Sequence, residues 1–136
     1  MSAKKFVVPA ELSVEEFVKG ALWGRVPLEN FTVLEDADGQ CWLLLVSSGG
    51  RNSMGGAKSV WHFPDDLQRV DIPLPWNDSA YHFWATAHLL PLPLKSPVTL
   101  KLVEERWGDW SPNYYNVSLF SVAANGQAEK LRLLDD

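Results

Sequence analysis

The residues best suited to acid–base chemistry are three histidines and two pairs of adjacent carboxylates. They are His62, His82, His88, Asp65-Asp66 and Glu104-Glu105. No two histidines stand four residues apart, which is the spacing of a helical metal clamp. Neighbouring side chains of a strand point to opposite faces, so Glu104 and Glu105 do not form a catalytic pair if their strand continues. We therefore predict no metal ion and no cofactor. A small hydrolase with His82, His88, Asp65 and Asp66 brought together by the fold remains an alternative.

A glycine-rich stretch, Ser47 to Ser59, faintly resembles a phosphate-binding loop. In the phosphate-binding pattern, lysine directly follows the second glycine, whereas here Gly56 and Ala57 separate Gly55 from Lys58. A strand, not a helix, is expected next, so no helix N-terminus points at a phosphate. We predict a long flexible surface loop, whose Arg51 and Lys58 can meet an acidic partner.

Seven tryptophans are the most unusual feature of the composition. Trp42, Trp61 and Trp84 lie inside apolar segments and are predicted to be core residues. Trp107 and Trp110 flank a turn between two expected strands. Tryptophan, tyrosine and arginine together are typical of interface hot spots, although such rings can also pack back onto their own domain. The predicted partner-binding residues are Trp76, Arg51, Lys58, Arg106, Trp107, Trp110 and Tyr114.

The elements that position these residues begin with a short helix. Ser13 and Glu16 form a capping box, and Val14, Phe17, Val18 and Ala21 share one face at helical spacing. Residues 31–35 and 40–46 read as strands joined by a turn that contains Asp38-Gly39. The second of these strands is apolar on both faces, so we expect it to be central and covered by the helix on one side.

The rest of the chain is expected to be strands with one ambiguous segment. Residues 60–63 indicate a short strand, and residues 70–72 an edge strand among prolines. Residues 79–90 match both a helical stripe and a strand alternation, and we predict a helix. Alternation in the C-terminal third predicts a three-stranded meander, with Asn125-Gly126 as a type I′ turn.

Length and composition limit the number of domains, the class of partner and the compartment that we expect. The 136 residues suffice for one domain, 1–136, and the net charge of −5 disfavours binding to nucleic acid. No apolar stretch reaches the length of a membrane helix, and the N-terminal segment lacks a signal-peptide core, so we expect a cytoplasmic protein with no membrane contact. The single Cys41 excludes an internal disulfide.

Together these features predict an α+β fold. It consists mainly of antiparallel sheet, an N-terminal hairpin plus a C-terminal three-stranded meander, with one or two short helices packed on it. The predicted function is a non-catalytic protein-binding or regulatory module, such as a small subunit of a larger cytoplasmic assembly. Besides the hydrolase, a module that stacks a sugar or a single-stranded nucleic acid on its aromatic side chains stays open, as does the oligomeric state.

Overall fold

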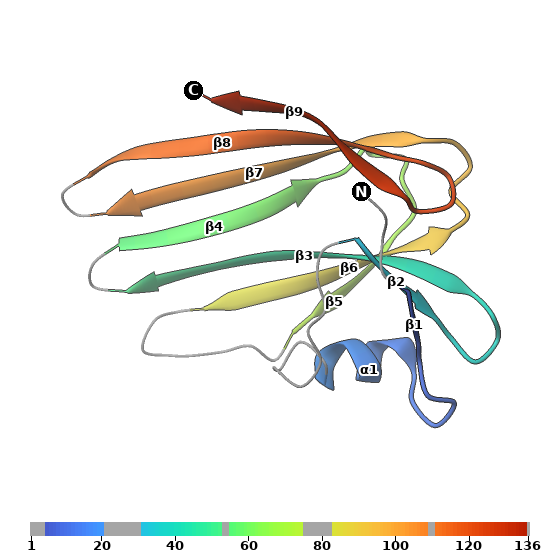
Figure 1. Ribbon diagram of the computed structural model, residues 1–136. Coiled ribbons are helices and arrows are strands. Elements are labelled where there is room, and N and C mark those ends of the chain that lie inside the picture. Colours follow the sequence, from blue (N-terminus) through green and yellow to red (C-terminus); the bar gives the residue numbers. More distant parts are fainter. Residues whose placement is uncertain (1–4, 21–30, 53–54, 75–82, 109–110, 136) are drawn as a thin grey trace.

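The sheet is organised around one long strand, β3 (Cys41–Asn52; Figure 1). The computed structural model describes residues 5–20, 31–52, 55–74, 83–108 and 111–135. Within them, one helix and nine strands follow each other as β1 (Lys5–Val7), α1 (Val14–Gly20), β2 (Thr32–Glu35), β3 (Cys41–Asn52), β4 (Gly55–His62), β5 (Val70–Pro73), β6 (Trp84–Leu92), β7 (Val98–Gly108), β8 (Ser111–Val122) and β9 (Ala128–Asp135).

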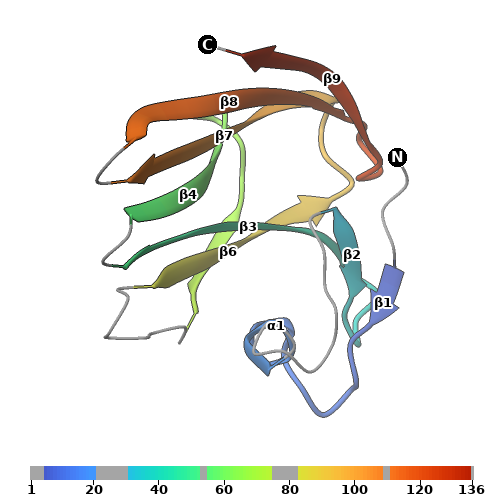
Figure 2. The same cartoon turned by 60° about the vertical axis from the view of Figure 1, so that its left-hand side comes forward.

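One edge of β3 is shared between two partners, and this divides the sheet. β6 pairs with β3 along residues 41–49, whereas the other edge pairs with β2 at residues 41–44 and with β4 at residues 48–52. Beyond Ser59, β4 leaves β3 and continues beside β7. The result is a lower layer (β1, β2, β3, β6, β5) and an upper layer (β4, β7, β8, β9). Figure 2 shows the sheet curling so that β7 and β8 lie above β3 and β6.

Two hydrophobic clusters fill this architecture. The inter-layer core takes Leu43 and Leu45 from β3, together with Phe31, Trp61, Leu90, Leu92, Leu94, Leu100, Leu102, Phe120, Val122 and Ala128. The helix-side core lies against α1 and contains Val8, Val18, Leu34, Leu44, Ile72, Ala87 and Leu89. Because alternate residues of β3 enter different clusters, the predicted central strand with a helix over one face is confirmed.

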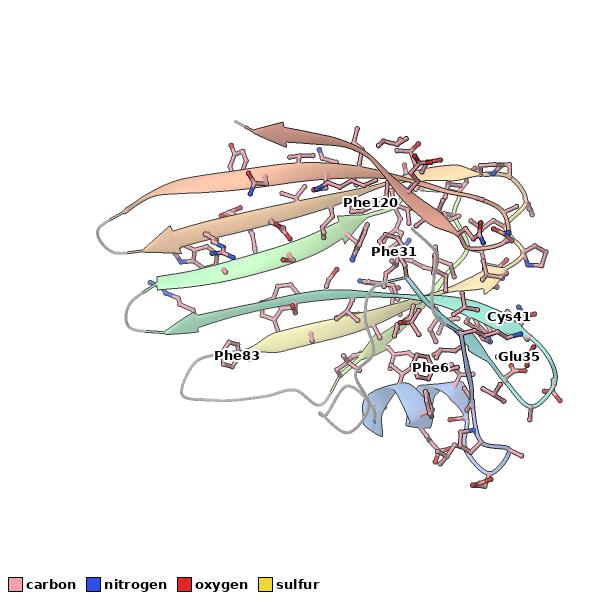
Figure 3. All side chains as sticks on the ribbon, viewed as in Figure 1. Phe6, Phe31, Glu35, Cys41, Phe83 and Phe120 are labelled. Atoms are coloured by element: carbon pink, nitrogen blue, oxygen red, sulfur yellow. The ribbon has the colours of Figure 1, made fainter. Side chains whose placement is uncertain are left out.

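An aromatic trio occupies the inter-layer core. Phe31, Trp61 and Phe120 have ring centroids 5.0–5.5 Å apart, and Phe31 with Phe120 is seen between the layers in Figure 3. Such tilted and edge-on pairs stabilise a core beyond their buried area. Trp61 is buried as predicted and Trp42 is half-buried, but the prediction for Trp84 is wrong, because that side chain is exposed.

The helix begins as the sequence predicts. The Ser13 hydroxyl accepts the Glu16 amide at 3.0 Å, and the Glu16 carboxylate accepts the Ser13 amide at 3.1 Å. Val18 is fully buried in the helix-side core, while Val14 and Phe17 pack against it. The capping box therefore starts α1, and its apolar face docks the helix on the lower layer.

Two hairpin turns share one geometry. In each, a glycine amide bonds back three residues, Gly39 to Asp36 and Gly126 to Ala123, and the glycine has a positive φ of 84° or 90°. A type I′ turn at Asn125-Gly126 is wrong, because Asn125 is not among the described residues with positive φ. The geometry is that of a type I turn followed by a left-handed glycine.

The predicted fold class is wrong. The described chain is mostly strand in a curled, half-barrel sheet with a single seven-residue helix, and the sheet is mixed because β1 runs parallel to β2. The C-terminal meander, the β2–β3 hairpin and the edge strand β5 are present. What fails is the balance of helix and sheet, because two further segments form strands.

Those two segments are residues 79–90 and the glycine-rich stretch. From Trp84 onward the former is strand β6, so a helix there is wrong; residues 79–82 lie outside the described residues. Both faces of β6 are buried, in different clusters, and this produces an apolar run that also fits a helix. The predicted loop is likewise wrong, since residues 47–52 extend β3 and residues 55–59 begin β4.

Candidate functional site

The strand register gathers aromatic and charged side chains at the β3–β4 end of the sheet. Directly opposed residues of antiparallel strands point to the same face. Across β6, β3, β4, β7 and β8 one such row is Trp84, Gly49, Lys58, Glu105 and Tyr115, and the adjacent row is Arg51, Gly56 and Trp107. We call the six side chains of these two rows the aromatic face.

Both tryptophans of the aromatic face lie over glycines. A Cβ added to Gly49 would come within 2.7 Å of Trp84 Cζ2, and one added to Gly56 within 2.6 Å of Trp107 Cζ2. Glycine is therefore needed at both positions for the indoles to sit against the backbone. Trp84 nevertheless remains 42% exposed. Each ring is thus supported from the sheet side, and Trp84 presents much of its surface to solvent.

The charges of the aromatic face are only partly paired. Lys58 Nζ lies 3.5 Å from Glu105 Oε2, in a partly exposed pair of the kind that contributes less than about 1 kcal/mol to stability. Arg51 is exposed. Among the described residues, none bonds to the Arg51 guanidinium, the Trp84 indole N–H or the Tyr115 hydroxyl. Within the described ranges, these three groups are therefore unpaired.

The opposite face of the same hairpin carries a different set. Its row includes Gly50, Ala57 and Arg106, and Phe83, which directly precedes β6, lies over Gly50 (Figure 3). A cavity of about 390 Å³ adjoins the hairpin, lined by Ser48, Gly49, Gly50, Ala57, Lys58, Ser59, Phe83 and Trp84. Two exposed aromatic residues, Phe83 and Trp84, are among those that line this cavity.

The structure divides the predicted partner-binding residues. It places Arg51, Lys58 and Trp107 together on the aromatic face, and Arg106 on the opposite one. Trp76 and Trp110 lie outside the described residues, as does the side chain of Tyr114. Sequence reasoning missed Trp84 and Tyr115, since only the pairing of β6 and β8 into the sheet brings them to this face. The glycine pairs 49–50 and 55–56 were the available signal.

A second polar arrangement links the two layers. Ser47 Oγ lies 3.0 Å from His88 Nε2, and His88 Nδ1 lies 2.9 Å from Asp71 Oδ1. The Trp61 amide donates to Ser47 Oγ at 3.1 Å, and the Arg69 guanidinium donates to Asp71 at 3.0 Å. We call this chain of hydrogen bonds the serine–histidine relay. Ser47 and His88 are 4% and 8% exposed.

Asp71 forms the outer end of the relay. Burial by itself raises the pKa of Asp71, but the hydrogen bond and charge of His88, together with Arg69, outweigh it and hold the pKa below its ordinary value. The Phe63 ring lies between Arg69, 4.6 Å from its centroid, and the His88 ring at 5.0 Å. Asp71 is therefore a carboxylate at neutral pH, which favours the tautomer in which His88 Nδ1–H donates to it.

The relay has the connectivity of a nucleophile, base and acid, but its surroundings give it another role. Ser47 Oγ is buried and already accepts the Trp61 amide. That amide follows the point where β4 leaves β3, so the strand ladder to β3 has ended there. Ser47 replaces the missing ladder partner, and His88 accepts the Ser47 hydroxyl. The relay accordingly satisfies buried polar groups at the split between the layers.

The other candidates for catalysis do not join this arrangement. Asp65 and Asp66 are exposed in the turn after β4, and His82 lies outside the described residues. Cys41 and Glu35 lie at the far end of the sheet from Phe83 (Figure 3), with Cys41 Sγ 3.9 Å from Glu35 Oε1. In the described part of the chain, no three His, Cys, Asp or Glu side chains are grouped to hold a metal ion.

Comparison of the chain with protein-family models, curated proteins and solved structures finds no match in any of the three. Nor does any helix in the described ranges have the length and apolar character needed to cross a bilayer. The function is therefore argued from the aromatic face and the relay.

Proposed function

We propose that this chain is a non-catalytic protein-binding module that recognises its partner with the aromatic face. The observation that carries this proposal is the pair of indoles over Gly49 and Gly56, on one face with Arg51 and Lys58. Tryptophan and arginine dominate the binding energy of protein interfaces. Rings already held against a sheet lose little conformational freedom on binding, which favours affinity.

Net charge and cysteine content support the proposed kind of partner and the proposed compartment. The net charge of −5 opposes polyphosphate partners, whereas the aromatic face itself carries two cations and one anion. A protein partner with few positive charges fits both facts. With a single cysteine the chain relies on no internal disulfide, which suits a reducing compartment, and we propose that it is a small subunit of a larger cytoplasmic assembly.

The test compares two matched double variants of the tagged protein. Trp84→Ala/Trp107→Ala removes both indoles of the aromatic face. Val70→Ala/Leu131→Ala removes two exposed apolar side chains elsewhere, on β5 and β9. Both variants are first shown by circular dichroism to fold. Partners purified from the native cells are quantified by mass spectrometry and then reconstituted with recombinant protein.

We expect at least one partner to be recovered equally with the wild type and with the Val70/Leu131 variant. Its recovery with the Trp84/Trp107 variant should be at least about tenfold lower. Equal recovery of every partner by all three proteins would contradict the proposal. So would equal loss from both variants, because binding would then not depend on the aromatic face.

The connectivity of the serine–histidine relay defines a second candidate function, a hydrolase, although the burial of Ser47 argues against it. If Ser47 were a nucleophile activated by His88, the protein would be a hydrolase that forms an acyl-enzyme. A fluorophosphonate probe distinguishes the two functions, since it labels activated serines. We expect no labelling of Ser47 in the folded protein. Labelling of the wild type that disappears in Ser47→Ala would instead establish the hydrolase.

A further inference from the structure

The hydrogen-bonding groups of the aromatic face are mainly donors. Arg51, the Trp84 indole N–H and the Tyr115 hydroxyl have no bonding partner among the described residues. The one carboxylate of the face, Glu105, is already paired with Lys58. A ligand that matches this surface supplies acceptors and brings few donors of its own, because a donor without an acceptor would lose its bond to water.

The distance between the two glycines under the indoles sets the spacing that a matching ligand needs. Gly49 lies opposite Lys58, and Gly56 is two residues further along the same strand. With strands about 4.8 Å apart and a rise of about 3.3 Å per residue, the two ring-bearing glycines are about 8 Å apart. A ligand that stacks on both rings must therefore repeat an apolar, ring-sized group at close to this distance.

We propose that the aromatic face binds a proline-rich segment of its partner in the polyproline II conformation; the inference rests on the proposed function. A polyproline II helix rises about 3.1 Å per residue with three residues per turn, so its prolines repeat on one side every 9 Å or so. Proline has a carbonyl acceptor but no amide donor, and its ring packs on aromatic side chains. These properties complement the donors and the ring spacing.

Two other ligands that use aromatic side chains fit less well. Every hydroxyl of a sugar is a donor as well as an acceptor and therefore needs acceptors on the protein. The only carboxylate of this face, Glu105, is already paired with Lys58. A single-stranded nucleic acid supplies acceptors and stacking bases, but its phosphates meet a protein of net charge −5. The proline-rich segment meets neither obstacle.

The experiment is a calorimetric titration of the full chain with a blocked decaproline peptide. A blocked glycine–serine decamer, a cello-oligosaccharide and an oligothymidine serve as comparison ligands. We expect decaproline to bind more tightly than all three. Trp84→Ala and Trp107→Ala should each weaken its affinity at least about tenfold, with Val70→Ala unchanged. Trp84→Phe, which keeps a ring but loses the indole donor, should lie between the wild type and Trp84→Ala.

Backbone and indole chemical shifts of the wild type give a second measurement that needs no variant. Decaproline should shift the signals of Gly49, Gly56 and the Trp84 indole. No binding of decaproline, equal affinity in Trp84→Ala, or tighter binding of the sugar or the oligonucleotide would each overturn the inference. If a protein partner is still lost from the Trp84/Trp107 variant while decaproline does not bind, the peptide class is wrong and the binding face stands.

Discussion

Replacing Ser47 by alanine tests whether the serine–histidine relay is structural. The change removes one oxygen from a site that is 4% exposed and leaves every apolar contact of the Cβ atom in place. Two groups lose their partner at once, the Trp61 amide, 3.1 Å from Ser47 Oγ, and His88 Nε2, 3.0 Å from it. The variant therefore measures what these two bonds contribute at the point where the layers separate.

The expected loss follows from the cost of unsatisfied buried groups. Each buried donor or acceptor without a partner costs about 1–3 kcal/mol, and His88 retains its bond to Asp71. The free energy of unfolding should fall by about 2–4 kcal/mol. For a domain of this size, a loss of 1 kcal/mol lowers Tm by about 3–5 °C, so the Tm should fall by roughly 10 °C.

The assay is urea unfolding followed by far-UV circular dichroism, with Ser48→Ala as the matched control. Ser48 is the next residue of β3, is half-buried and makes no side-chain hydrogen bond within the described residues. Its replacement should change the free energy of unfolding by less than about 0.5 kcal/mol. A Ser47→Ala/His88→Leu double variant should lose less than the two single losses added together. Equal stabilities of Ser47→Ala and Ser48→Ala would refute the structural role of the relay.

Three further predictions concern the relay, the aromatic face and the helix. Because folding lowers the pKa of Asp71, its carboxylate contributes to the free energy of unfolding above about pH 4, and this contribution is lost as the pH falls further. The stability difference between wild type and Asp71→Asn in urea unfolding should therefore shrink from pH 7 to pH 3. A constant difference would contradict this. Gly49→Ala should displace the Trp84 ring and weaken partner binding in calorimetry, whereas Gly20→Ala, which meets no atom within 4 Å, should not; equal affinities would count against the glycine support. Ser13→Ala should lower the free energy of unfolding by about 1 kcal/mol, and no change in thermal unfolding would show that the capping box contributes nothing.

Local patterns predicted the local structure of this chain. The capping box at Ser13, the apolar run of β3 and the alternation in the last three strands each depend on neighbours in sequence, and each is found in the fold. The error at β6 has a physical cause. Its residues are buried on both faces, so the apolar pattern fits a helix as well as a strand, and the ladder with β3 decides in favour of a strand. The glycine-rich hairpin was missed because its aromatic support comes from Phe83, Trp84 and Trp107, which are distant in sequence.

The candidate site, too, was predictable in its residue types but not in how strand pairing arranges them. Residue type alone marked Trp107, Arg51 and Lys58 as partner-binding candidates, but it joined them with Arg106, which lies on the other face. The direction of a strand side chain depends on the register, and a shift of one residue reverses it. The serine–histidine relay joins three strands whose residues lie as far as 41 positions apart in the sequence, so no local spacing could reveal it.

Composition and short-range patterns establish that this chain is acidic, holds one cysteine, caps a helix at Ser13 and carries an excess of tryptophan. These are properties of composition and of contacts within a few residues. The three-dimensional fold, by contrast, exposes Trp84 on the same face as Trp107 and brings Ser47 to His88. The reason is that β3 divides one of its edges between β2 and β4, and pairing between distant strands sets both which side chains share a face and which amides need another partner.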